Sequence, residues 1–255
     1  MSDFMKVSIL TPAHNEENVI ERCILSVKKL ILPKNVHLEH VVIADRCSDR
    51  TIAICRRHEV KILKKEFRSA CVSAITDALT FGVKNVTGDI IGKVDADVIL
   101  PSNWLQVLLP YIDEKTLSVA SETMASGSFM WLRNLNYRLS PFGRQPRGQA
   151  RLINNTLLKK IGGFDCTKPT WDTALDLKAC KYGLLSKRVP QVTVIEKRNY
   201  SILRIIFHQI SAGRARRQLG INPLRTLLHA IFRGRFWVFL GYFLETKRSN
   251  TKKRD

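Results

Sequence analysis

The chain contains few of the sequence features of small folds that are stabilised by disulfides or metal ions. Its 255 residues include six cysteines, but no C-x-x-C pair and no tight cluster of cysteine with histidine. This absence excludes a zinc-stabilised domain, and we expect the cysteines to be small, reduced core residues. With 45% hydrophobic residues, the chain can bury a sizeable core, which argues against a disordered or fibrous protein.

Long apolar segments are also absent. The longest uncharged apolar run near the C-terminus, Phe236 to Leu244, has nine residues, whereas a helix needs about 20 residues to cross a bilayer. Met1 to Lys6 includes Asp3 and runs directly into a strand pattern, so we expect no secretory signal peptide. These absences predict a cytoplasmic protein that does not span a membrane.

Acidic residues are scarce toward the C-terminus. The whole chain carries a formal net charge of +20, and residues 197–255 hold fourteen lysines and arginines against two acidic residues. A charge excess of this kind indicates contact with an anionic partner. Residues 247–255 are basic and of low complexity, and we expect them to be disordered.

The first half of the chain alternates between strand and helix patterns. Apolar β-branched runs predict strands at 7–10, 41–44, 60–63 and 90–94, with amphipathic helices between them. We expect the first helix to begin at Glu16 with Asn15 as its cap, and Ser102 to cap the helix that includes Trp104. Strands that alternate with helices predict a mainly parallel sheet with helices on both faces.

Each predicted strand leads into a polar loop, and in open α/β sheets ligands bind at those carboxyl ends. Asp95 and Asp97 follow the strand at 90–94. If a turn begins there, both carboxylates can approach one ion, and hard carboxylate oxygens together with phosphate oxygens suit Mg²⁺ or Mn²⁺. The alternative is a strand that ends in two solvated aspartates.

Five segments taken together favour the metal site. They are VSILTPAHNE at 7–16, VVIADRCSDRT at 41–51, GDIIGKVDADVILPSNWL at 88–105, IGGFD at 161–165 and residues 171–183. In order and spacing they resemble family 2 glycosyltransferases. The resemblance implies the GT-A fold, a Rossmann-like mixed and mainly parallel sheet flanked by helices. It also implies inverting, metal-dependent transfer of a sugar from a UDP or GDP sugar to a hydroxyl or lipid-phosphate acceptor.

The resemblance also implies roles for individual residues. The nucleotide pocket would be lined by Pro12, Ala13, Asn15 and Glu16. Asp45 would contact the base, Asp95 would face the ribose or the metal, and Asp97 would ligate the metal. Asp45 is otherwise a turn residue that bonds its own backbone. Ala44 stands where the family often has a second aspartate, which leaves the choice of base open.

The catalytic segment departs from the family pattern at one position. The family commonly has Glu-Asp followed after two residues by Leu; here Trp171 replaces the glutamate, whereas Asp172 and Leu175 match. Asp172 is therefore the candidate general base, and its alternative is a first-turn carboxylate favoured by the helix dipole. With a lipid-phosphate acceptor, Asp172 would orient the acceptor instead. Asp176, one turn later, is either a helper or a surface charge.

The segment before the catalytic helix carries arginines and glycines. Residues 140–148 contain prolines, glycines and arginines and predict a mobile loop. Arg144, Arg147 and Arg151 would either clamp the diphosphate or lie on the surface as solvated charges. Gly162 and Gly163 would either let the backbone pass close to the acceptor or form a plain turn.

We expect a catalytic domain at 1–195, a basic amphipathic helical region at 196–246 and a disordered tail at 247–255. Arginines and aromatic residues interleave between Leu224 and Leu244. This pattern is typical of an interfacial helix on an anionic membrane, bound through Arg214 to Arg235, or of a helix packed on the catalytic domain. The first alternative predicts a peripheral protein at the inner face of the cytoplasmic membrane.

Other functions fit parts of the sequence. The net charge of +20 suggests nucleic-acid binding, but no finger, RNP-like or basic-zipper pattern accompanies it, so we expect no specific nucleic-acid partner. A nucleotidyltransferase would share the fold, but residues 12–16 stand where its Gly-rich phosphate loop is expected. A catalytically degenerate relative is a further alternative because Trp171 and Ala44 depart from the family pattern.

Overall fold

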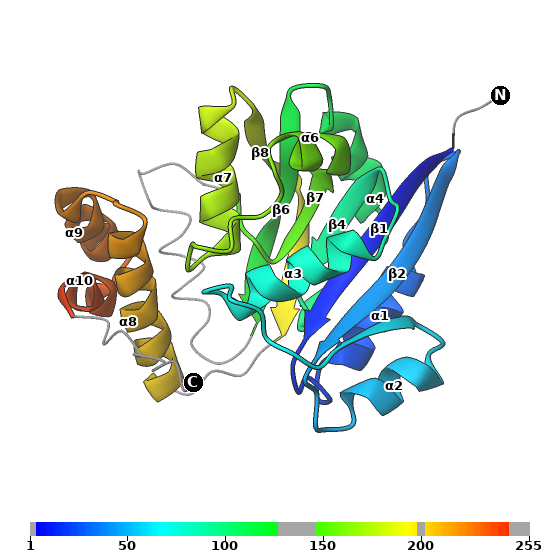
Figure 1. Ribbon diagram of the computed structural model, residues 1–255, viewed down its shortest axis with the longest axis horizontal. Coiled ribbons are helices and arrows are strands. Elements are labelled where there is room, and N and C mark those ends of the chain that lie inside the picture. Colours follow the sequence, from blue (N-terminus) through cyan, green and yellow to red (C-terminus); the bar gives the residue numbers. More distant parts are fainter. Residues whose placement is uncertain (1–3, 127–145, 198–201, 245–255) are drawn as a thin grey trace, which may run out of the picture. The chain divides into compact units, whose positions relative to one another are not determined.

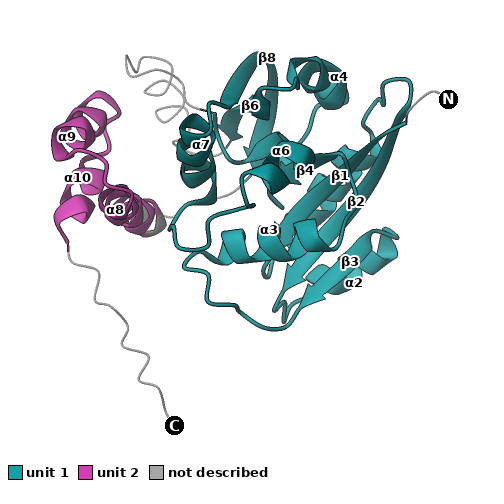
Figure 2. Cartoon of the chain, turned by 45° about the horizontal axis from the view of Figure 1, so that its top comes forward, with its two compact units in different colours: residues 1–134, 144–199 teal, residues 135–143, 200–255 magenta. Residues whose placement is uncertain are grey.

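The computed structural model of the protein describes residues 4–126, 146–197 and 202–244 (Figure 1). The chain divides into two compact units: unit 1 comprises residues 1–134 and 144–199, and unit 2 comprises residues 135–143 and 200–255 (Figure 2). The predicted tail at 247–255, Arg144 and most of the predicted loop at 140–148 lie outside the described residues.

In its described residues, unit 1 is built on one eight-stranded mixed sheet. Its strands are β1 (Met5–Ala13), β2 (Val36–Asp45), β3 (Lys61–Lys65), β4 (Ile90–Val94), β5 (Val98–Ile99), β6 (Thr116–Ser126), β7 (Ala150–Asn154) and β8 (Leu185–Lys197). The order is β3-β2-β1-β4-β7-β6-β8-β5. Strands β3, β2, β1 and β4 run parallel, and β7 is antiparallel to both β4 and β6. The mixed, mainly parallel sheet predicted from the sequence is confirmed.

Helices cover both faces of this sheet. They are α1 (Ile20–Lys28), α2 (Thr51–Arg57), α3 (Ala74–Lys84), α4 (Trp104–Leu108), the 3₁₀ turn η1 (Leu109–Tyr111), α6 (Asn155–Lys160) and α7 (Trp171–Lys181). Side chains of α1 and α4 share one buried cluster with Val7 and Ile9, whereas α3, α6 and α7 share another with Leu10. Side chains at neighbouring positions of β1 therefore point to opposite faces of the sheet, as strand geometry requires.

Both predicted helix caps are wrong. Helix α1 begins at Ile20, after Val19, which makes no side-chain cap bond. Asn15 has a φ of 55°, and its Oδ1 accepts a hydrogen bond from the backbone N of Ser48 at 2.8 Å. Its amide is thus used to join two loops. Helix α4 follows Asn103, which also makes no side-chain cap bond, so Ser102 is not its cap.

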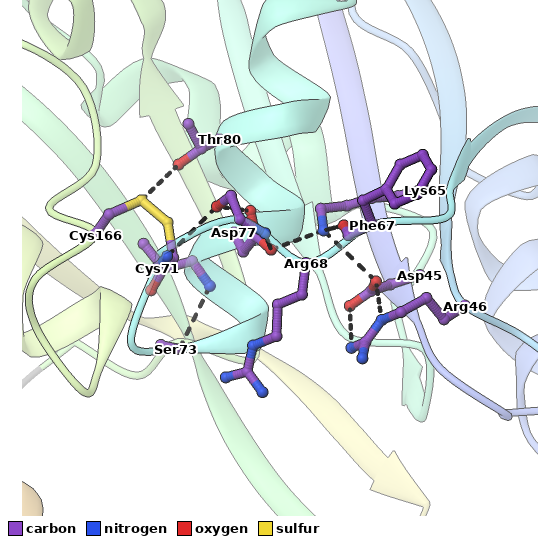
Figure 3. A network of polar contacts seen from close by, with 12 residues as sticks. Asp45, Arg46, Lys65, Phe67, Arg68, Cys71, Ser73, Asp77, Thr80 and Cys166 are labelled. Carbon is purple, nitrogen blue, oxygen red and sulfur yellow. Dashed lines mark hydrogen bonds and ion pairs between the residues drawn. A yellow bond between two sulfur atoms is a disulfide. The ribbon is translucent and has the colours of Figure 1, made fainter. Parts of the chain in front are cut away.

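The cysteines do not all behave as predicted. Cys23 and Cys55 are free and buried, but Cys71 and Cys166 form a disulfide across 95 residues, with their Cα atoms 4.4 Å apart (Figure 3). Cys180 is exposed. The bond joins the loop after β3 to the loop after α6, two segments that only the folded sheet brings together. Spacing along the sequence could not reveal that meeting.

Unit 2 consists of α8 (Ile202–Gln218), α9 (Pro223–Phe232) and α10 (Phe236–Phe243) in its described part. The single helix expected across 224–244 is therefore wrong: it is two helices, and Gly234 between them has a φ of 56°. Nowhere in the described ranges does a helix reach the length and apolar character that a bilayer crossing requires.

A glycine contact holds two helices of unit 2 together, and it leads to a prediction. A Cβ atom at Gly213 in α8 would overlap the backbone oxygen of Val238 in α10, and one at Gly241 would overlap the backbone of Ile210. We expect Gly213→Ala to lower the unfolding free energy by about 1–3 kcal/mol, because backbone cannot yield as a flexible side chain can. Denaturant unfolding measures this. Ser211→Ala, at an exposed position of the same helix, is the matched control.

A partly buried histidine predicts how stability depends on pH. His40 in β2 lies 3.0 Å (Nε2) from the Thr11 hydroxyl, and burial, assisted by Lys28, lowers its pKa to about 4. Between pH 6.5 and 4 the unfolded chain binds a proton that the folded chain does not, so stability falls as pH falls. The loss reaches about 3 kcal/mol. In His40→Gln, unfolding curves over this range should show a shallower decline; equal declines would contradict the assignment.

Candidate functional site

The candidate site lies where the parallel strands end. Ala13 at the end of β1 is in register with Ala44, next to the end of β2, and β4 pairs with β1 on its other side. The loops that follow these three strands therefore meet at one edge of the sheet (Figure 1). This is the edge where open α/β sheets bind ligands.

The loops after β1 and β2 are joined by polar contacts. The amide oxygen of Asn15 accepts from the backbone of Ser48, and the Glu16 backbone N donates to the Thr51 hydroxyl at 2.8 Å. The structure thus brings Asn15 and Glu16 beside the loop that follows Asp45. Pro12 and Ala13 form the end of β1 directly before them. All of the residues predicted to line a nucleotide pocket lie at this edge.

Asp45 is buried, and its side chain is part of an ionic network (Figure 3). Arg46 donates to both of its carboxylate oxygens, at 2.9 and 3.2 Å, and Lys65 Nζ lies 3.7 Å away. Lys65 also pairs with Asp77 at 2.7 Å. Asp45 and Arg46 therefore form a side-by-side pair. The carboxylate can accept a hydrogen bond from a ligand, and the guanidinium can donate one to it.

Asp95 and Asp97 occupy a turn directly after β4. The backbone N of Val98 donates to the Asp95 oxygen at 3.1 Å, which closes the turn that the metal hypothesis required. Burial raises the pKa of Asp95 to about 6, while Lys93 opposes the shift and the carboxylates of Asp97 and Glu196 reinforce it. Like charges held together in this way favour a bound cation.

These carboxylates fit a divalent cation that also binds phosphate. Within 4–126, 146–197 and 202–244 no group of three histidine, cysteine or acidic side chains could hold a metal ion. Asp95 and Asp97 would thus supply two hard oxygens, and a diphosphate and water would supply the others, as is common for Mg²⁺. The donor set suits Mg²⁺ or Mn²⁺ and offers no soft ligand.

Lys93 was not predicted to belong to the site. Its side chain is 1% exposed, and its Nζ donates to Asp95 Oδ1 and to the Gly148 oxygen, both at 2.5 Å. A sequence signal was present: Lys93 is the one charged residue in the buried strand β4. A lone lysine at a buried position needs an anionic partner.

Asp172 lies in the first turn of α7, as both of its interpretations required. A Cβ atom at Gly148 would come within 2.8 Å of Asp172 Oδ2, so this carboxylate lies against the chain at Gly148. The next residue, Gln149, accepts a hydrogen bond from the Asp95 backbone N at 2.9 Å. One short segment therefore contacts both the candidate base and a candidate metal ligand.

Arg151 does not belong to a surface loop or clamp. It is fully buried in β7 and donates to Oδ1 of Asp176 at 2.6 Å, so Asp176 is not a free surface charge. Arg147 is half-buried beside Gly148. Gly162 and Gly163 have φ values of 78° and 72°, and no backbone lies within 4 Å of a Cβ built there. They are glycines because the turn needs positive φ.

Comparison with known proteins adds a family match. The sequence model described as "Glycosyl transferase family 2" matches residues 8–168. The chain is 27% identical over 207 residues to a probable glycosyltransferase of Bacillus subtilis, covering 72% of this chain and 48% of that protein. It is 26% identical over 193 residues to the beta-monoglucosyldiacylglycerol synthase of Synechocystis, covering 69% and 40%. The chain spans about half the length of the curated relatives it matches.

Solved structures share the fold. A mannosyltransferase of Pyrobaculum calidifontis, in complex with GDP-Man and Mn²⁺, is similar with a TM-score of 0.65 at 19% identity, over 92% of this chain and 72% of that one. Glucosyl-3-phosphoglycerate synthase of Mycobacterium tuberculosis, in complex with Mn²⁺, UDP-glucose and phosphoglyceric acid, gives 0.62 at 20% identity, over 86% and 81%. These likenesses show the GT-A fold.

Proposed function

Because the chain belongs to glycosyl transferase family 2, we propose that it moves a sugar from a nucleoside-diphosphate sugar to an acceptor, with inversion at the anomeric carbon. The contacts of Asp95 and Asp172 with the segment at 148–149, together with Asp97 in the same turn as Asp95, carry this proposal. The proposal is supported because one short segment contacts both a carboxylate suited to a metal-bound diphosphate and a carboxylate suited to an acceptor.

Each group has a defined task in this scheme. Asp95 and Asp97 would hold the divalent cation, which when bound neutralises charge on the leaving diphosphate. Asp172 takes the proton of an acceptor hydroxyl as its oxygen attacks the anomeric carbon, or orients an acceptor phosphate that is already anionic. Arg147, beside the same segment, is our candidate for a contact to the diphosphate.

The Asp45–Arg46 pair suggests which bases fit. A carboxylate accepts from a ring N–H, and a guanidinium donates to an adjacent carbonyl oxygen. Uracil and guanine carry this lactam edge, whereas cytosine and adenine present a ring acceptor beside an amino group. We therefore propose that the donor is a UDP or GDP sugar.

The reaction product tests the proposed chemistry. Incubation with UDP and GDP sugars, Mn²⁺ and a panel of acceptors should release nucleoside diphosphate. Release of pyrophosphate from a nucleoside triphosphate and a sugar phosphate would instead establish a nucleotidyltransferase. Absence of both products with every donor would favour a catalytically degenerate protein.

We also propose that unit 2 binds an anionic membrane surface. Large apolar side chains are exposed on all three helices: Leu203, Phe207, Leu224, Ile231, Phe232, Phe236, Trp237, Leu240 and Phe243. Residues 202–244 include several arginines and no acidic residue. Exposed apolar surface among arginines matches a lipid interface with negative head groups. The cytoplasmic and peripheral location expected from the sequence stays a prediction.

Vesicle sedimentation tests this surface. The intact protein should bind phosphatidylglycerol vesicles better than phosphatidylcholine vesicles, and high salt should release it. Phe207→Ser combined with Phe236→Ser should weaken binding, because both side chains are about two-thirds exposed. Phe67→Ser, at an exposed aromatic position in unit 1, is the control. Equal, salt-sensitive binding to duplex DNA would favour the nucleic-acid alternative.

A further inference from the structure

Two buried cations lie side by side in the centre of the sheet. Lys93 in β4 and Arg151 in β7 are paired in register, and their side chains are 1% and 0% exposed. Both lie over the indole ring of Trp171 in α7, with Lys93 Nζ 5.0 Å and Arg151 Cζ 5.7 Å from the ring centroid. A buried charge is costly unless its partners offset it, so those partners reveal what each cation does.

The two cations have partners of different kinds. Arg151 donates to Asp176 at 2.6 Å and to the Ser118 hydroxyl at 2.8 Å, which ties α7 to the sheet. Lys93 donates to Asp95 Oδ1 and to the Gly148 oxygen, both at 2.5 Å. Lys93 thus contacts a candidate metal ligand and the backbone segment against which the candidate base is packed.

We propose that Lys93 is a positioning residue for the transfer reaction. It holds Oδ1 of Asp95, which leaves Oδ2 as the oxygen that would bind the cation, and it fixes the chain at Gly148, against which Asp172 lies. One ammonium group therefore fixes the position of Asp95, which would bind the donor through the cation, relative to Asp172, the candidate base for the acceptor. This inference rests on the function proposed above and adds a residue that neither the sequence pattern nor the family resemblance assigned.

Trp171 supports this role because its side chain carries no negative charge. A glutamate at this position would give Lys93 a second anionic partner. The indole ring instead lies against the ammonium group. Its face attracts the cation but forms no ion pair that would compete with Asp95. Lys93 is then left to bind Asp95 and Gly148. The departure at Trp171 and the lysine in β4 form one arrangement.

The direction of the change in cation affinity on removal of the Lys93 charge distinguishes a positioning role from a purely electrostatic one. Removal of a positive charge beside a metal ligand should strengthen cation binding if charge alone matters. Loss of a group that orients a metal ligand typically weakens metal binding by about 10- to 100-fold. Weaker binding after the charge is removed therefore points to orientation.

The experiment measures Mn²⁺ binding with UDP and with GDP by calorimetry and by electron paramagnetic resonance. Lys93→Met should weaken Mn²⁺ binding in the nucleotide complex by about 10- to 100-fold and change the resonance of bound Mn²⁺. Arg188→Met removes a partly buried cation of the same sheet, one that pairs with Glu122 and not with the site. It should leave the Mn²⁺ affinity within about twofold of the unmodified protein.

The outcomes distinguish this inference from the function on which it rests. If the unmodified protein binds neither nucleotide with Mn²⁺, both proposals fail. If it binds and folded Lys93→Met binds as tightly or more tightly with an unchanged resonance, only the role of Lys93 is overturned. Should Lys93→Met not fold, Lys93→Gln keeps a donor for the Gly148 oxygen, and the same weakening is expected of it.

Discussion

Asp97→Asn should reduce sugar transfer by about a thousandfold or more. Asp97 is buried in the turn after β4, and with Asp95 it supplies the carboxylates suited to the cation. Stabilisation of the leaving diphosphate contributes several kcal/mol to the transition state, and each 1.36 kcal/mol is a factor of ten in rate. Steady-state release of nucleoside diphosphate, measured across Mn²⁺ concentrations, gives the result directly.

A control separates lost chemistry from lost structure. Asp113→Asn removes a carboxylate that pairs with Lys187 at 2.7 Å at the start of β6, away from the strand ends that form the site. It should transfer sugar at nearly the rate of the unmodified protein. If Asp97→Asn retains full turnover and the same dependence on Mn²⁺, the assignment of the metal ligands is wrong.

Asp172→Asn should lower turnover by about 10²- to 10⁴-fold with a hydroxyl acceptor, the range expected when a general base is removed. The amide is close in size to the carboxylate, so the packing against Gly148 should persist. Donor binding involves Asp95 and Asp97 and should change little. The expected signature is a fall in kcat with an almost constant KM for the donor.

Asp176→Asn gives the comparison for the second carboxylate of α7. Asp176 pairs with buried Arg151, so its loss should lower stability more than it changes the chemical step at equal folded concentration. A normal kcat in Asp172→Asn together with a large fall in Asp176→Asn would move the role of base to Asp176. With a hydroxyl acceptor, a fall below tenfold in both variants would contradict a general base on α7.

The part of the fold that the sequence predicted is the part with local signals. Strand β4 at 90–94 was predicted with its observed bounds, because an apolar run between polar turns is a local pattern. The pairing of β6, β7 and β8 was not predicted. Strands that are far apart in the sequence can pair without leaving any local pattern in it. Glycine and polar residues around β7 also made its periodicity irregular.

The candidate site shows the same division. Asp95 and Asp97 were predicted as metal ligands because two carboxylates after a strand suit a cation and the surrounding segments resemble the family, and Asp172 was predicted as the base because its spacing follows the family pattern. Lys93 was missed although a lone lysine in a buried strand was a signal, and the pairing of Arg151 with Asp176 was missed because an ion pair between β7 and α7 depends on tertiary contacts. The cap predicted at Asn15 failed for a related reason: its side chain bonds a distant loop at Ser48 in place of its own helix.

Thermal unfolding with a panel of nucleotides tests the central claim most directly. The panel holds UDP, GDP, CDP and ADP with their sugars, with and without Mn²⁺, on the intact protein and on Asp97→Ala. A ligand that binds only the folded state adds about 2.7 kcal/mol at one hundred times its dissociation constant. We predict stabilisation by a uridine or guanosine diphosphate and its sugars that needs Mn²⁺ and is lost in Asp97→Ala. Stabilisation by none of them, or equal stabilisation of the variant, would contradict the proposed site.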